Sequence, residues 1–294
     1  MEQEKDRLIR GMAIGGKVRA FAVRTTALVE ELRRRHDTYP TATAALGRTV
    51  TAAAMMGAML KGNEKLTVQV KGDGPLGQVV ADANAKGEGR GYVFEPHVHL
   101  PSNSMGKLDV AGAVGTTGFV NVTKDLGLKE AYRGSVPMIS GELGEDFTYY
   151  FALSEQTPSA VGLGVLVDTD NSVIVAGGFI VQLLPGLTDS EVTVIEQAVG
   201  AMPPVTSLLE QGMSIEEMLQ FLLPDVQVMD ELDITFKCTC SRERVEKTII
   251  SLGEQEIQQL IDEDEVTEVV CDFCREAYQF GSADMKEILT QAKQ

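Results

Sequence analysis

The sequence predicts an α+β protein in three parts: an N-terminal mixed α/β core domain, a helical linker, and a small C-terminal domain built around four cysteines. Residues 1–184 alternate between helical and extended patterns, whereas residues 185–232 contain two helix-start signals and no basic residue. All four cysteines of the 294-residue chain follow residue 237. With 44% hydrophobic residues, the chain can bury one large core and a small additional domain.

The first part, residues 1–184, is expected to be the α/β core domain. A strand is predicted at residues 17–24 and a helix at 26–35. A second helix, at residues 41–60, is rich in Ala and Met and is expected to be largely buried. Further strands are predicted at 66–70, 78–83, 119–123, 148–153, 162–167 and 173–183, with a short helix at 154–160.

The second part, residues 185–232, is expected to be an acidic, amphipathic helical linker. Two capping boxes mark helix starts, one formed by Thr188 with Glu191 and the other by Ser214 with Glu217. The second is followed by an apolar stripe at helical spacing: Ile215, Met218, Leu219 and Leu222. Because such short helices are marginal in isolation, we expect this stripe to dock on the core domain.

Negative charge is concentrated in the middle of the chain. The formal net charge is −17, and no Lys or Arg occurs between Arg133 and Lys237. Sixteen of the 43 acidic residues lie between these two positions, and the rest of the chain carries 27 acidic and 26 basic residues. Such a surface repels polyanions, which argues against nucleic-acid binding. In the linker, mutual repulsion of the acids is expected to keep docking marginal and reversible.

The third part, residues 233–294, is expected to be a small domain that binds metal. Two short helices are predicted at 241–250 and 254–262, then a strand–turn–strand at 269–280 and a last helix at 282–292. The pairs Cys238-Thr-Cys240 and Cys271-Asp-Phe-Cys274 are separated by 30 residues. Four thiolates match the tetrahedral preference of Zn²⁺, so we predict one zinc ion held by Cys238, Cys240, Cys271 and Cys274. The flanking cations expected to offset the negative charge of this centre are Lys237, Arg242, Arg244 and Arg275.

The metal could be a structural staple or part of a redox switch. It would close a long loop in a domain too small to be stable on its core alone. Disulfides within each pair would close only tiny loops, so oxidation would remove the long-range link. From the spacing alone, both interpretations stay open.

Other motifs do not indicate catalysis, and we expect no enzyme activity. Residues 71–77 contain G-x-G-x-x-G, but an extended segment follows them, so a β-hairpin turn is predicted rather than a dinucleotide site. His97 and His99 are expected to have surface or packing roles. The charged N-terminus and the absence of a long apolar run predict a cytoplasmic protein that does not enter membranes.

The cysteine motif Cys238-Thr-Cys-Ser-Arg-Glu-Arg244, together with Cys271-Asp-Phe-Cys274, resembles that of the 33-kDa chaperonin family, the redox-regulated heat-shock holdases. Supporting matches lie in order along nearly the whole chain: Gly72-Asp-Gly-Pro75, Ser154-Glu-Gln-Thr-Pro158, Ala176-Gly-Gly178 and Pro185-Gly186.

This resemblance implies a specific activity. In such proteins the reduced, zinc-bound form is inactive. Peroxide or hypochlorous acid, usually with unfolding conditions, oxidises the cysteines, zinc is released and the C-terminal domain melts. The linker then unfolds and exposes apolar surface, and the protein holds unfolding clients without ATP. The resemblance implies disulfides Cys238–Cys240 and Cys271–Cys274, client proteins as partners, and a homodimer in the active state.

Two other functions remain as alternatives. A constitutive zinc-ribbon adaptor would keep its zinc and its activity in peroxide. A thiol–disulfide oxidoreductase would need its C-x-x-C at a helix N-terminus in a thioredoxin-like unit, whereas a strand–turn–strand is predicted here.

Overall fold

The computed structural model describes residues 5–263 and 265–292, and the chain divides into two compact units, Met1–Lys237 and Cys238–Gln294. Residues 185–232 pack within the first unit, while their expected role as a separate linker stays a prediction. Among the described residues, no helix has the length and apolar character needed to cross a membrane.

The N-terminal unit contains two sheets. The first is antiparallel throughout, with strand order β10-β1-β2-β9-β8. Its strands are β1 (Arg7–Ala13), β2 (Val18–Arg24), β8 (Ser159–Val167), β9 (Val173–Leu183) and β10 (Gln227–Asp233).

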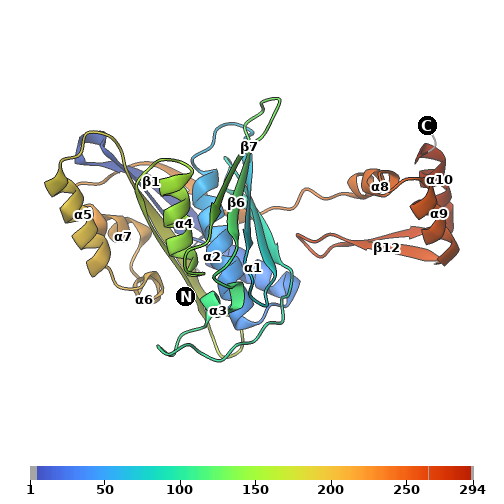
Figure 1. Cartoon of the computed structure of the whole chain (residues 1–294), viewed down its shortest axis with the longest axis horizontal. Coiled ribbons are helices and arrows are strands. Elements are labelled where there is room, and N and C mark those ends of the chain that lie inside the picture. Colours follow the sequence, from blue (N-terminus) through green and yellow to red (C-terminus); the bar gives the residue numbers. More distant parts are fainter. Residues whose placement is uncertain (1–4, 264, 293–294) are drawn as a thin grey trace. The chain divides into compact units, whose positions relative to one another are not determined.

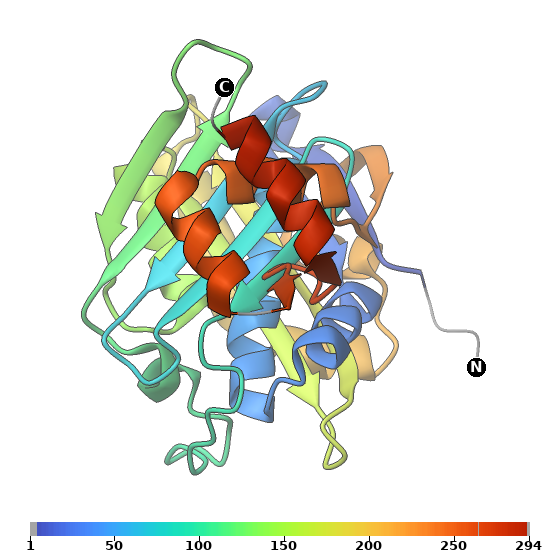
Figure 2. The same ribbon diagram turned by 90° about the vertical axis from the view of Figure 1, so that its right-hand side faces the viewer.

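The second sheet has strand order β11-β5-β4-β3-β6-β7 and is antiparallel except where β11 meets β5. Its strands are β3 (Lys65–Lys71), β4 (Gln78–Asn84), β5 (Glu88–Val93), β6 (Phe119–Asp125), β7 (Tyr132–Pro137) and β11 (Thr235–Phe236). The loop between β6 and β7 extends beyond the ends of these strands (Figures 1 and 2).

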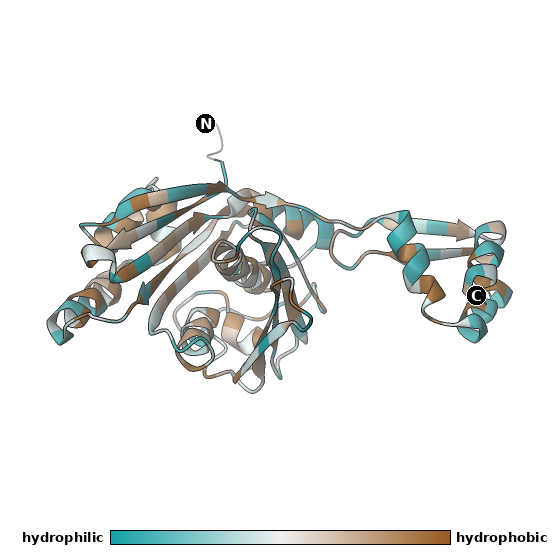
Figure 3. Ribbon diagram, turned by 90° about the horizontal axis from the view of Figure 1, so that it is seen from above, coloured by the Kyte–Doolittle hydropathy of each residue, from teal (hydrophilic) through white to brown (hydrophobic). Residues whose placement is uncertain are grey.

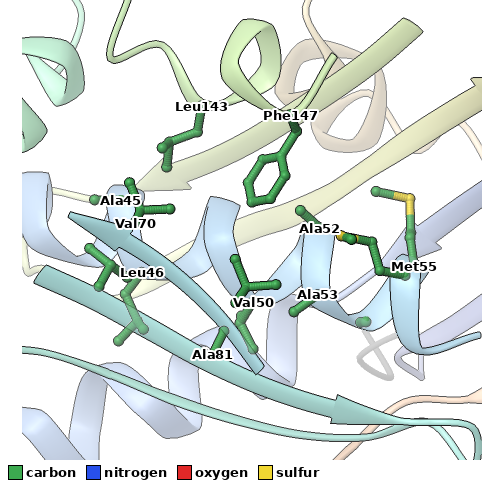
Figure 4. Packing of buried hydrophobic residues seen from close by; sticks show 14 of the residues in the cluster. Ala45, Leu46, Val50, Ala52, Ala53, Met55, Val70, Ala81, Leu143 and Phe147 are labelled. Atoms are coloured by element: carbon green, nitrogen blue, oxygen red, sulfur yellow. The ribbon is translucent and has the colours of Figure 1, made fainter. Parts of the chain in front are cut away.

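Helix α2 (Pro40–Gly57) lies between the two sheets and is almost wholly buried, as predicted. Its alanines and Gly47 allow close approach, since a Cβ at Gly47 would lie 2.7 Å from a Val29 methyl group. Figure 4 shows Leu46 and Val50 of α2 beside Val70 and Ala81 of the second sheet. Helices α1 (Thr26–His36), α3 (Val110–Val114) and α4 (Leu143–Leu153) complete the main core.

A further layer, made of three helices, covers the face of the first sheet that points away from α2 (Figure 1). It consists of α5 (Asp189–Ala201), α6 (Val205–Glu210) and α7 (Ile215–Leu222). Both predicted capping boxes are present, and all four residues of the predicted stripe on α7 are buried. They pack with a separate apolar cluster that includes Ile9, Ala20, Ala22 and Phe179 of the sheet. The helices therefore owe their stability to docking on this sheet.

Two predicted elements are wrong. Residues 148–153, predicted as a strand, belong to helix α4, because Phe147, Tyr150 and Phe151 bury one helical face against the core. Residues 154–160, predicted as a short helix, form a loop and the start of β8. Elements that the sequence analysis did not predict include β1, β5, β7, β10, β11 and α3.

The glycine-rich loop after β3 is the predicted hairpin connection, since β3 pairs with β4. Its glycines let the loop backbone lie close against α3. A Cβ at Gly72 would lie 2.0 Å from the carbonyl oxygen of Val114, and one at Gly74 would lie 2.4 Å from that of Ala113. These contacts explain the motif without a nucleotide.

The C-terminal unit is a small α/β domain. It contains α8 (Arg242–Ile250), α9 (Glu254–Glu263), β12 (Val266–Val270), β13 (Ala277–Gly281) and α10 (Ser282–Ala292), with β12 and β13 paired antiparallel. Hydrophilic and hydrophobic residues alternate on its helices (Figure 3). Among its described residues, the buried apolar cluster comprises six side chains: Val245, Ile249, Ile257, Phe280, Met285 and Ile288. So small a core needs further stabilisation.

Asp6 is a buried carboxylate that should make the stability of the N-terminal unit depend on pH. It accepts hydrogen bonds from the backbone amides of Ala27 and Leu28 at the start of α1. Burial nevertheless raises the pKa of Asp6 from 3.8 to about 6. Between these values the folded unit holds one proton more than the unfolded chain, so its free energy of unfolding falls as pH rises. Above pH about 6 the loss is complete, on the order of 3 kcal/mol.

Asp6→Asn is therefore expected to flatten the pH dependence of urea unfolding between about pH 4 and 6. The variant should also be less stable at the acid end, because the Asn amide group cannot accept both backbone hydrogen bonds. An unchanged slope over this range would show that Asp6 does not titrate as described.

Candidate metal centre

The four cysteines converge in the C-terminal unit. Cys238 and Cys240 precede α8, whereas Cys271 and Cys274 lie in the turn between β12 and β13. The Sγ atoms of Cys238 and Cys271 are 3.8 Å apart, those of Cys240 and Cys274 are 3.3 Å apart, and all four lie within 4.8 Å of one another. In a tetrahedral site with Zn–S bonds near 2.3 Å, sulfur atoms are about 3.8 Å apart. The cluster thus has the spacing of a single four-thiolate metal site.

The C-x-x-C half is held by the β12–β13 turn. The amide of Cys271 donates to the carbonyl oxygen of Glu276 (2.9 Å), and the amide of Arg275 donates to that of Cys271 (2.8 Å). Arg275 has a left-handed backbone with φ of 59°. The paired strands fix both ends of the turn, so this half-site is positioned by local structure.

The C-x-C half is held by α8. Ser241 caps the helix by accepting a hydrogen bond from the amide of Arg244. The Arg244 guanidinium donates to both the carbonyl and the hydroxyl oxygen of Thr239, each at 2.8 Å, and so anchors the residue between the two cysteines.

Two of the four expected flanking cations are paired with acids. Lys237 lies 3.2 Å from Glu88 in the N-terminal unit. Arg242 pairs with Asp284 at 2.8 Å and lies over the Phe280 ring. These acids share the charge of the two cations, and the expectation that all four cations offset the thiolate charge stays a prediction.

Tyr278 is a residue of the site that the sequence analysis missed. Its hydroxyl donates a hydrogen bond to Cys240 Sγ at 3.1 Å, and this contact raises the pKa of Tyr278. The available signal was weak: a tyrosine in a predicted strand, four residues after Cys274.

The thiols have the properties of metal ligands. Burial raises the pKa of Cys274 and of Cys271, so both hold their protons unless a nearby cation compensates the charge of the thiolate. A divalent ion supplies that compensation, and four soft sulfur donors suit zinc. Among the described residues this is the one cluster of Cys, His, Asp or Glu close enough to hold a metal. The donor set therefore fits the predicted zinc.

The histidines are placed elsewhere. His97 Nε2 lies 3.3 Å from an Asp37 carboxylate oxygen, and its ring packs on Tyr39 with centroids 5.0 Å apart. These contacts support the predicted surface and packing role.

Comparison with known proteins finds relatives over almost the whole chain. The model of the family described as Hsp33 protein matches residues 6–281. Proteins called 33 kDa chaperonin from Bacillus cereus (strain B4264) and Bacillus anthracis (strain A0248) are each 53% identical over 287 residues, which cover 97% of this chain and 99% of the relative. The crystal structure of a 33 kDa chaperonin, the heat shock protein 33 homolog from Thermotoga maritima, matches with a TM-score of 0.93 and 37% identity. That match covers 98% of this chain and 99% of the other.

Proposed function

The chain belongs to the Hsp33 protein family, and we propose that it is a redox-regulated, ATP-independent holdase. The family is one of chaperones rather than an enzyme class, so binding of client proteins follows from membership. The finer proposal is that the reduced, zinc-bound form is inactive and that oxidation of the four cysteines activates it.

Oxidation of both cysteine pairs would remove all four zinc ligands. When bound by Cys238, Cys240, Cys271 and Cys274, Zn²⁺ supplies a tetrahedral crosslink that stabilises the small C-terminal unit. Each pair of thiols gives two electrons and two protons to one molecule of hydrogen peroxide, which becomes two molecules of water. The disulfides Cys238–Cys240 and Cys271–Cys274, proposed from the family resemblance, would join only near neighbours.

The observation that carries the proposal is the buried apolar face of residues 185–232, which lies just ahead of the cysteines in the chain. After α7, the chain forms β10 at the edge of the first sheet and then β11 beside β5 of the second. The amides of Thr235 and Lys237 donate to the carbonyl oxygens of Gly87 and Gly89. Melting of the C-terminal unit would free the end of this connecting segment and favour release of the helices before it.

Several acids of this segment form ion pairs with basic residues in or next to the first sheet, and this attraction would offset part of the mutual repulsion expected from charge alone. Arg7 of β1 makes a two-pronged ion pair with Glu216 of α7, with 2.8 Å between Nη2 and Oε2, and also lies 3.4 Å from Glu231 of β10. Lys17 lies 3.3 Å from Glu191 of α5. Basic residues near the N-terminus thus face the acidic segment and make its docking sensitive to salt.

Arg7→Gln is expected to weaken docking by about 1 kcal/mol, because the pair is only partly exposed and two-pronged. The reduced protein should then suppress client aggregation several-fold better than the wild type, and added salt should narrow the difference. Light scattering of an unfolding client measures both effects.

Glu210→Gln is the matched control, since Glu210 is exposed and the described part of the chain shows no ion pair for it. Equal basal activity of Arg7→Gln and wild type at low salt would contradict a role of this ion pair in docking.

We further propose that the protein acts in the cytoplasm on unfolded or partly unfolded clients, forms a homodimer when active, and binds neither nucleic acid nor membranes. The negative charge between residues 134 and 236 supports the exclusion of nucleic acid.

A chelator assay of zinc before and after peroxide, run beside an aggregation-suppression assay, tests the proposal. The expected result is loss of one zinc per chain together with a gain of activity. A constitutive zinc-ribbon adaptor, the remaining alternative, predicts that zinc content and activity both stay unchanged.

A further inference from the structure

The hydroxyl of Tyr278 joins the two halves of the cysteine cluster. Tyr278 lies in β13, opposite Val269 of β12, in the hairpin whose turn carries Cys271 and Cys274. Its ring packs against the small C-terminal core. From there the hydroxyl reaches Cys240, 38 residues earlier in the chain, with an oxygen–sulfur distance of 3.1 Å.

We propose that Tyr278 is a positioning residue of the redox switch: its hydroxyl orients Cys240 Sγ, withdraws charge from the thiolate, and so raises the oxidant level needed to open the site. This inference rests on the proposed function and adds a determinant of its threshold. A phenol keeps its proton near neutral pH and can therefore donate to a thiolate. Hydrogen bonds to charged acceptors are the strong ones, and those to ligand sulfurs tune metal sites.

The hydrogen bond affects oxidation because it lowers the electron density on the Cys240 thiolate, which is the attacking nucleophile. In the first step a thiolate attacks one oxygen of hydrogen peroxide, the O–O bond breaks, a sulfenic acid forms and water leaves after protonation. A neighbouring thiol then displaces water from the sulfenic acid to give the disulfide. A thiolate that shares its charge with a hydroxyl is a weaker nucleophile. The hydroxyl thus slows the first step at Cys240 while strengthening the site.

Tyr278→Phe tests this inference, because it removes the hydroxyl and keeps the ring that packs in the core. Tyr132→Phe is the matched control. It removes a hydroxyl that bonds to Ser154 in the N-terminal unit. Both variants are made in the full-length, reduced protein, and Co²⁺ replaces zinc as a spectroscopic probe.

The expected result for Tyr278→Phe has three parts. The sulfur-to-cobalt charge-transfer band moves to longer wavelength, because the thiolate electrons are less stabilised. Zinc affinity, measured by competition with a chromophoric chelator, falls about tenfold. Peroxide releases zinc faster. Tyr132→Phe matches the wild type in all three.

An unshifted cobalt band in Tyr278→Phe would overturn the inference even if zinc affinity fell, because loss of packing alone weakens binding without changing the sulfur electrons. If wild-type protein binds cobalt but peroxide releases no zinc, the proposed redox function fails. In that case the shift of the cobalt band still shows whether the Tyr278 hydroxyl withdraws charge from Cys240 Sγ. If the wild type binds neither metal, both proposals are overturned.

Discussion

The reduced protein carrying both Met218→Ala and Leu219→Ala is expected to suppress client aggregation without any oxidant. Both side chains are fully buried between α7 and the first sheet. Truncation of a buried Met or Leu to Ala costs about 2–5 kcal/mol. The two truncations together should therefore exceed the free energy that keeps this eight-residue helix docked. Zinc should stay bound, because neither residue belongs to the C-terminal unit. Light scattering and zinc analysis on the same sample measure this.

Phe221→Ala is the control on the same helix. Phe221 is 43% exposed on the outer face of α7, so its loss should leave docking and the low basal activity unchanged. If the double variant stayed inactive while exchanging α7 amides freely, release of this helix would not be what activates the protein.

Loss of one cysteine ligand should have the largest effect on stability. Cys274→Ser is expected to abolish tight zinc binding and to unfold the C-terminal unit, because structural zinc contributes about 10–16 kcal/mol to such small domains. The six-residue apolar cluster cannot replace that contribution. Limited proteolysis should cleave after residue 237 and leave a resistant N-terminal fragment, and basal chaperone activity should rise.

Thr239→Ser is the control for this variant. It lies between two cysteines and keeps the hydroxyl oxygen that accepts from Arg244. A Cys274→Ser protein whose C-terminal unit stayed folded and protease-resistant would show that the metal does not hold this unit together.

Local signals were sufficient for part of the fold. The capping boxes of α5 and α7, the buried stripe of α7 and the helix at Ser282–Ala292 each depend on residues close in sequence. Residues 148–153 of α4 were predicted as a strand because aromatic and β-branched residues favour strands. Their helical conformation depends on packing against the core, which the local sequence does not show. Strand β10 gave no signal, because almost all of its residues are exposed and backbone pairing with β1, over 200 residues away, holds it.

The same distinction applies to the site. Spacing alone predicted the four cysteines, because each pair chelates locally. Tyr278 could not be predicted, since its contact with Cys240 depends on the placement of a hairpin against a segment 38 residues earlier. The ion pairs of the acidic segment could not be predicted either. Its net charge indicated mutual repulsion of the acids, whereas in the structure Glu216 pairs with Arg7 and Glu191 with Lys17.

The central claim is that the cysteines control the docking of α7. Hydrogen exchange of the α7 amides, Ile215–Leu222, in the full-length protein before and after peroxide tests it most directly. We predict slow exchange in the reduced, zinc-loaded protein. After oxidation, α7 should exchange rapidly while β2 and β9 stay protected. Unchanged protection of α7 in oxidised protein that suppresses aggregation would contradict the account.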